Sequence, residues 1–436
     1  MKKTKLSGRF WVALTVFSLV GQIAWVVENM YFNVFIYKMF HASAAAISTM
    51  VAASAVAATV TTLLIGALSD KLGKRKLFIC GGYILWGVSI WSFALIRTDV
   101  IHALFPAAVS AASVGVSLVI VMDCVMTFFG STANDACFNA WLTDATDETN
   151  RGSAEGINAM MPLLAILVVF GGFLSFNLDL PESWTTIFSI IGALVLAIGV
   201  LGIFLIRDVP VSTEENQNYF RNIFYGFRPS VMGRNKLLYA VLAAFAVFGI
   251  SIQIFMPYLI LYYTQTLHMD NYVLIMAPAI VAAAAVTVVW GKLYDRFGFE
   301  KTVTPALVML MLGYVVLYFF RSTALVFVGS LLMMSGYLSG MAVFGAMLRD
   351  YTPKNRAGMF QGLRIVGQVL IPGIVGPYIG ALVLRNADTV VNSDGTISFI
   401  PNANIYLAAF VAAAAVWAVL AGVFRLLKKE PCHENS

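Results

Sequence analysis

The chain consists of long apolar runs separated by short polar connections, and this alternation restricts it to a membrane-embedded helical fold. Of its 436 residues, 60% are hydrophobic and only 11% are charged. A soluble chain of this size could not cover its surface with so few charges. A hydrocarbon core of about 30 Å needs about 20 apolar residues per helix. On that basis the sequence predicts twelve spans, at 10–37, 43–67, 76–97, 116–142, 153–177, 184–206, 237–263, 272–294, 302–320, 323–347, 356–384 and 403–425.

Two polar strings occur twice in the same order, which indicates two related halves. GALSDKLGKRK at 66–76 returns as GKLYDRFGFEK at 291–301. LTDATDETNRG at 142–152 returns, with one residue dropped, as LRDYTPKNRAG at 348–358. The repeated polar strings lie between apolar runs, so the duplicated unit is a bundle of membrane helices, and such bundles usually move a solute between their halves.

The lysines and arginines give the predicted topology. With the N-terminus inside, 23 of the 28 fall in inner segments, 4 fall in outer segments, and Arg364 lies within a span. This excess places both termini and all four repeated strings on the cytosolic side. The net charge of +6 is spread over short connections, so we expect no nucleic-acid partner. The predicted domains are an N-terminal six-helix half at 1–206, a cytosolic linker at 207–236 that includes a helix on the membrane surface, and a C-terminal six-helix half with a short cytosolic tail at 237–436.

The sequence lacks the motifs of other membrane-protein classes. The four histidines are scattered, the four cysteines have no metal-ligand spacing, and no HExxH or GxSxG string occurs. No GxxxxGK[ST] string for direct use of ATP is present, and nothing resembles a channel filter. We therefore predict that the protein is not an enzyme, needs no cofactor or metal, and carries out secondary transport.

The first repeated string resembles a known loop signature. Gly66-x-x-x-Asp70-x-x-Gly73-x-Arg75-Lys76, with its degenerate copy, is similar to the signature of the major facilitator superfamily. The resemblance covers essentially the whole chain. It implies an all-α membrane protein with twelve transmembrane helices in two pseudo-symmetric six-helix halves, in which spans 1 and 4 line a central cavity. We expect a monomer in the plasma (inner) membrane, in contact only with lipid and its small-molecule substrate.

A second, weaker resemblance concerns span 4 and its exit. The stretch from Asp123 through Asp144 to Asn150-Arg151-Gly152 is similar to the glycoside–pentoside–hexuronide cation symporters and the related sucrose-type carriers. This implies a sugar or glycoside as the solute. Two contacts of those carriers are missing, because span 2 has no carboxylate before Asp70 and position 139 is asparagine rather than arginine. We therefore favour a proton as the coupling ion, with Na⁺ as the alternative.

The repeated strings offer a charge-locked gate at the cytosolic side. Asp70 can face the positive N-terminus of a neighbouring helix, and Arg75 can pair with an acidic group. The alternative is that the basic residues only set topology. The residues that we assign to the gate are Gly66, Asp70, Gly73, Arg75, Asp144, Arg151, Asp295, Asp350 and Arg356.

Charged and amide side chains within the spans predict the solute and cation site, because a charge in the bilayer seldom persists without a task or a partner. They form three stripes, on spans 1, 4 and 11. The stripes contain Glu28, Asn29 and Asn33; Asn134, Asp135 and Asn139; and Gln361, Arg364 and Gln368. Asp123 is a further candidate on span 4.

The depth of each charge follows from a rise of 1.5 Å per residue. Asp135 and Arg364 lie at about 12–13 Å from the inner ends of their spans, so we predict a pair that is either structural or bridged by substrate. The same estimate places Glu28 and Asp123 near the outer face, where solvent exposure would lower the free-energy cost of their charges. Glu28 and Asp135 are the predicted proton carriers. The alternative functions are proton-driven efflux of drugs or lipophiles and movement of lysolipids.

Overall fold

The computed structural model describes residues 6–106, 110–147, 150–208, 225–352, 362–392 and 395–428, apart from the side chains of residues 70, 151 and 152. The chain divides into two compact units. Unit 1 contains Met1–Tyr219 and Val391–Ser398, and unit 2 contains Phe220–Val390 and Phe399–Ser436. Unit 1 therefore includes a short segment whose neighbours along the chain on both sides belong to unit 2.

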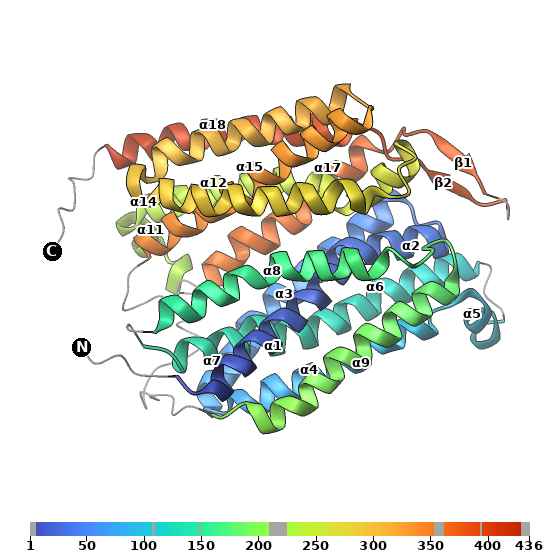
Figure 1. Ribbon diagram of the computed structural model, residues 1–436, viewed down its shortest axis with the longest axis horizontal. Coiled ribbons are helices and arrows are strands. Elements are labelled where there is room, and N and C mark those ends of the chain that lie inside the picture. Colours follow the sequence, from blue (N-terminus) through green and yellow to red (C-terminus); the bar gives the residue numbers. More distant parts are fainter. Residues whose placement is uncertain are drawn as a thin grey trace. The chain divides into compact units, whose positions relative to one another are not determined.

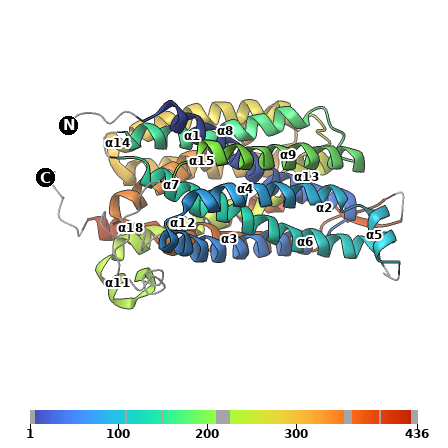
Figure 2. The same cartoon turned by 90° about the horizontal axis from the view of Figure 1, so that it is seen from below.

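Unit 1 is a bundle of six long helical spans, several of them broken by a change of helix type. Its helices are coloured from blue to green in Figure 1. Span 1 begins where the Ser7 hydroxyl accepts a hydrogen bond from the Phe10 backbone N–H. Figure 2 shows α3, α4 and α6 side by side. The elements are α1 (Gly8–Val26), η1 (Val27–Phe32), α2 (Asn33–Phe40), α3 (Ala44–Leu72), α4 (Arg75–Ser92), η2 (Phe93–Leu95), α5 (Thr98–Leu104), α6 (Ala111–Gly130), η3 (Ser131–Phe138), α7 (Asn139–Asp144), α8 (Arg151–Phe173) and α9 (Pro181–Leu205).

Unit 2 is a second helical bundle. A two-stranded hairpin precedes its last helix, and most of this hairpin, residues 391–398, belongs to unit 1. Of the predicted linker, 207–208 and 225–236 are described, and they contain the short helix α11. The elements are η4 (Tyr225–Phe227), α11 (Pro229–Arg234), α12 (Lys236–Phe255), η5 (Met256–Tyr258), α13 (Leu259–Leu261), η6 (Tyr262–Thr266), α14 (Tyr272–Phe319), α15 (Thr323–Tyr351), η8 (Val366–Leu370), α17 (Ile371–Val383), β1 (Thr389–Val391), β2 (Ile397–Phe399) and α18 (Asn404–Leu427).

The number of spans agrees with the sequence. The described residues contain eleven helices that are long and apolar enough to cross a membrane. One of them, α14, consists of two helices that meet at a kink at Gly298. With α14 counted as two, the twelve predicted spans are confirmed.

The glycines of the repeated string explain why its two copies break the helices. Gly73 has φ 62° and Gly298 has φ 76°, which are left-handed backbone conformations that L-residues with a Cβ rarely adopt. The two residues occupy the same position in the two copies. Gly73 ends α3 just before α4, and Gly298 turns the chain within α14. The repeat seen in the sequence is therefore also a repeat of backbone geometry.

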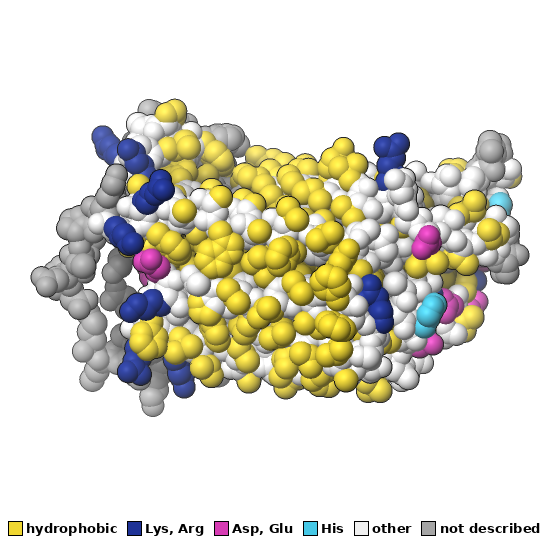
Figure 3. Space-filling view, turned by 90° about the horizontal axis from the view of Figure 1, so that it is seen from above, with side chains coloured by type: hydrophobic (Ala, Val, Ile, Leu, Met, Phe, Trp, Pro, Cys, Tyr) yellow, Lys and Arg dark blue, Asp and Glu magenta, His cyan; other side chains and the backbone are white. Residues whose placement is uncertain are grey.

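Aromatic side chains fill the interior of each unit. Tyr83 and Trp86 are fully buried in unit 1, and Tyr262, Tyr314 and Tyr406 are fully buried in unit 2. Many Leu, Val and Phe side chains remain exposed on the outside. Hydrophobic side chains cover the middle of the face in Figure 3, and lysines and arginines gather toward one end. This distribution fits a protein embedded in lipid.

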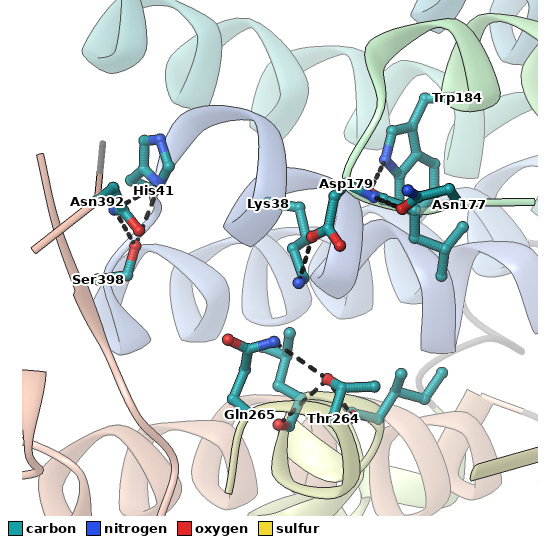
Figure 4. Close-up of polar contacts among 12 residues, drawn as sticks. Lys38, His41, Asn177, Asp179, Trp184, Thr264, Gln265, Asn392 and Ser398 are labelled. Carbon is teal, nitrogen blue, oxygen red and sulfur yellow. Dashed lines mark hydrogen bonds and ion pairs between the residues drawn. The ribbon is translucent and has the colours of Figure 1, made fainter. Parts of the chain in front are cut away.

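The segment 391–398 packs on the end of α2. His41 ends that helix in a left-handed conformation, with φ 50°. The Asn392 Nδ2 and Ser398 Oγ atoms each lie 3.1 Å from His41 Nδ1. Figure 4 draws these contacts. Ser398 is buried, at 3% exposure, and its hydroxyl oxygen also lies 2.8 Å from Asn392 Nδ2. The hairpin is therefore attached to unit 1 by a polar cluster.

The connection between the third and fourth spans, near 98–116, contains a helix. Its helix is α5, of which Ile101 is buried while Leu104 is 68% exposed. Arg97 Nε donates to Asp99 Oδ1 at 3.1 Å, and this hydrogen bond lowers the pKa of the Asp99 carboxyl. This connection is thus partly helical, and its helix is anchored by the buried Ile101 side chain.

Candidate functional site

Two carboxylates lie in the interior of unit 1. Glu28, in η1, is 7% exposed, and Asp123, in α6, is 2% exposed. The expectation that they are solvent-exposed at the outer face is wrong. Both spans continue beyond their predicted outer ends. Glu28 lies twelve residues from Phe40, the outer end of span 1, and Asp123 lies twelve residues from Ala111, the outer end of span 4. Each distance corresponds to about 18 Å of helix. Neighbouring helices cover them at that position.

Side chains from three spans meet at Glu28. Ser54 Oγ, from α3, donates to Glu28 Oε1 at 2.6 Å, and Thr127 Oγ1, from α6, donates to the same oxygen at 2.9 Å. The two hydroxyl oxygens are 2.8 Å apart. The sequence did not point to Ser54 or Thr127. A hydroxyl in a membrane helix commonly bonds the carbonyl four residues earlier, as Thr59 does with Ala55, so these residue types carry no signal of a site by themselves.

Two buried oxygens in this cluster have no hydrogen-bond partner among the described residues. They are Glu28 Oε2 and Asp123 Oδ1. The two carboxyl groups are close enough to interact electrostatically, and Asp135 also acts on Glu28. We name Glu28, Asp123, Ser54 and Thr127 the carboxylate cluster.

The predicted stripe on span 1 is divided between two environments. Asn33 is buried, at 1% exposure, whereas Asn29 is exposed. Asn29 Nδ2 donates to the Trp25 carbonyl and Asn33 Nδ2 donates to the Asn29 carbonyl, each at 2.8 Å. The prediction of one continuous polar face is wrong, because Val27–Phe32 is a π-helical segment and its wider turn changes the angular spacing of the side chains.

The stripe on span 4 is divided in the same way. Asn134 is buried and donates from Nδ2 to the Tyr83 hydroxyl at 2.8 Å. Asp135 is half-buried, and its Oδ2 accepts a hydrogen bond from Ser131 Oγ at 2.9 Å. Asn139 is exposed, with Nδ2 3.2 Å from the Asp135 carbonyl oxygen. These residues also lie in or next to a π-helical segment, η3, so both predicted proton carriers are on π-helical backbone. Such segments are frequent at functional sites.

The gate residues of unit 1 form a buried ion pair. Arg75 is 4% exposed, and its Nε lies 3.1 Å from Asp144 Oδ2. Arg75 Nη1 also donates to Ser69 Oγ at 2.5 Å. The two repeated strings of this half are thus joined directly. Gly66 is half-buried on α3 next to Ala136, while the side chains of Asp70 and Arg151 are outside the described part of the structure.

Unit 2 joins its two strings through a different residue. Tyr294 donates its hydroxyl to Asp350 Oδ2 at 2.6 Å. Asp350 corresponds to Asp144 in the repeat, and Glu300 replaces Arg75. Asp295 is exposed, and Arg356 lies outside the described residues.

The predicted site residues of span 11 are only partly described. Arg364 and Gln368 are half-buried, and Gln361 lies outside the described residues. Asp135 and Arg364 belong to different units, so their pairing stays a prediction. Among the described residues, no group of three or more His, Cys, Asp or Glu side chains could hold a metal ion.

Known proteins share this architecture. The family model of the Major Facilitator Superfamily matches residues 10–377 and 279–435. No curated protein matches the sequence at a significant level. Among solved structures, a variant of the nucleoside transporter NupG is 13% identical, with a TM-score of 0.69 and coverage of 94% of this chain and 98% of that one.

Two further structures agree with the chain over nearly its whole length. The xylose transporter XylE from E. coli is 15% identical, with a TM-score of 0.68 and coverage of 98% of this chain and 100% of that one. A bacterial homologue of the human lysosomal transporter Spinster is also 15% identical, with a TM-score of 0.67 and coverage of 98% of both chains. At these identities the likeness establishes the fold.

Proposed function

Because the chain belongs to the major facilitator superfamily, a family of membrane transporters, we propose that it is a secondary active transporter of a small polar solute, coupled to a proton. The solute class that we favour is a sugar or glycoside, carried by alternating access in the plasma membrane with both termini in the cytosol. We further propose that the protein acts as a monomer and needs no cofactor. NupG and XylE, which transport a nucleoside and xylose, support a polyhydroxylated solute.

One observation carries the coupling part of the proposal: Glu28 is buried in unit 1 and two hydroxyl groups donate to it. An ionised carboxylate in a lipid-embedded bundle costs several kcal/mol, so it persists where it has a task. A carboxylate that gains and loses a proton can change the charge of the interior during a transport cycle. Asp135, which is half-buried, is the second proposed carrier and is more accessible to solute and water.

The exposed amides near these carboxylates suit a solute that forms hydrogen bonds. Asn29 and Asn139 are both exposed, and each is within four residues of a predicted proton carrier. Asn side chains donate and accept, as sugar hydroxyls require. We propose that the predicted site residues on spans 1, 4 and 11 bind solute or cation. The Arg75–Asp144 pair would then hold the cytosolic gate in one state of the cycle.

The test is uptake of a panel of labelled glycosides and nucleosides into proteoliposomes, with and without an imposed pH gradient. At least one solute should accumulate only with the gradient. Glu28→Gln and Asp135→Asn should lose gradient-driven accumulation and retain solute exchange. Glu300→Gln, which changes an exposed carboxylate, is the matched control and should behave like the wild type.

Two outcomes would contradict the proposal. Full gradient-driven uptake by both carboxylate variants would remove the coupling assignment. Extrusion of cationic dyes without uptake of any solute in the panel would favour efflux of drugs or lipophiles instead.

A further inference from the structure

The carboxylate cluster has an internal asymmetry that the proposed function leaves unexplained. Both described hydroxyl donors, on Ser54 and Thr127, point at one oxygen of Glu28. Asp123 receives no hydrogen bond from the described residues, although it is the more deeply buried of the two acids. Two acidic side chains thus lie close together, and only one of them accepts hydrogen bonds from hydroxyl groups.

The charges that act on this pair are all negative. Glu28 and Asp123 act on one another, Asp135 acts on Glu28, and Cys124 is the other titratable group beside Asp123. In the described part of the chain, no lysine, arginine or histidine forms an ion pair with either acid. Two unpaired negative charges in a low-dielectric interior repel each other strongly, so one of them is neutralised.

The hydroxyl groups decide which acid remains ionised. Hydrogen bonds donated to a carboxylate favour its charged form, and Glu28 receives two. Burial has its largest free-energy cost for an ionised carboxylate that accepts no hydrogen bonds, as Asp123 would be. A protonated Asp123 would also supply a donor in a cluster where Glu28 Oε2 and Asp123 Oδ1 both lack a partner.

We propose that Glu28 and Asp123 form a proton-binding pair that, without solute, holds one proton on Asp123 while Glu28 is ionised and available to accept the coupling proton. This proton reduces the charge of the pair from two negative charges to one, and a second proton, on Glu28, would neutralise the pair. The inference rests on the proposed function for its role in transport. Ser54 and Thr127 are positioning residues that keep the charge on Glu28.

Infrared spectroscopy of the purified full chain in detergent, without solute, tests the pair separately from transport. The protein at neutral pH should show a protonated-carboxyl band. Biosynthetic ¹³C-labelling of aspartate should shift this band, and labelling of glutamate should leave it in place. The band should be lost in Asp123→Asn and retained in Asp388→Asn, which changes an exposed aspartate and serves as the control.

Two further comparisons keep the proposal open to refutation if Asp123→Asn folds poorly. Asp123→Glu retains the carboxyl group, so its band should respond to the glutamate label. The double variant Ser54→Ala with Thr127→Val removes both donors, so part of its band should also respond to the glutamate label.

Absence of the band in the wild type, or a wild-type band that shifts only with the glutamate label, would overturn the assignment. The spectra should be the same in NaCl and in choline chloride. A band that is present only without Na⁺ would contradict the proposal, because it would mean that the pair binds Na⁺ in place of the proton. Because no solute is added, these results remain informative even if the transport assay fails.

Discussion

Replacing Gly73 by alanine tests whether the repeated string acts through backbone geometry. Gly73 has φ 62°, and a Cβ added there would have no heavy atom within 4 Å, so the substitution introduces no steric clash. The cost is therefore conformational. A left-handed residue with a Cβ costs about 1–2 kcal/mol, and the reduced freedom of the unfolded chain offsets about 0.4–1 kcal/mol. The expected net loss of stability is about 1 kcal/mol.

The measurement is equilibrium unfolding in detergent, followed by loss of helical circular dichroism. Gly81→Ala is the matched control, because Gly81 lies within α4, has no unusual φ, and also has open space around it. That change should stabilise the protein by about 0.4–1 kcal/mol. Gly73→Asn should fall between Gly73→Ala and the wild type, because asparagine tolerates left-handed φ better than alanine does. Equal effects of alanine at the two glycines would refute the reasoning.

Two substitutions and one labelling experiment test contacts within a single unit. Arg75→Ala should lower the stability of unit 1 by about 1–3 kcal/mol, because it leaves the half-buried Asp144 without its partner; an unchanged thermal unfolding midpoint would contradict this. Tyr294→Phe removes only the hydroxyl that donates to Asp350 and should cost about 0.5–1.5 kcal/mol, which denaturant titration can measure and a zero effect would disprove. Cys124, which is half-buried, should react with a membrane-permeant maleimide before the two fully buried cysteines, as mass spectrometry of labelled peptides would show; the reverse order would be inconsistent with the packing of α6.

The sequence predicted those parts of the fold that depend on local pattern. Apolar run length was enough to find the spans, and the repeated string identified Gly73 and Gly298 before their φ values were known. Both are properties that neighbouring residues along the chain determine. The family resemblance rested on the same string and is confirmed by the family model.

The interior of unit 1 could not be predicted in the same way. Ser54, Thr127 and Glu28 come from three spans and meet only through tertiary packing. The burial of Glu28 was misjudged because a distance along one span does not show which neighbouring helices cover a residue. The predicted polar faces assumed a regular α-helical period, which the π-helical segments interrupt.

The hairpin segment 391–398 changes what a cut in the chain would do. The polypeptide passes from unit 1 to unit 2 between Tyr219 and Phe220, and it returns to unit 1 once more through this segment. If the two halves were expressed as separate polypeptides, the second would still carry its own strand pair for docking on His41 of the first. The polypeptide thus crosses between the two units at three places, and only the crossing between Tyr219 and Phe220 lies in the linker.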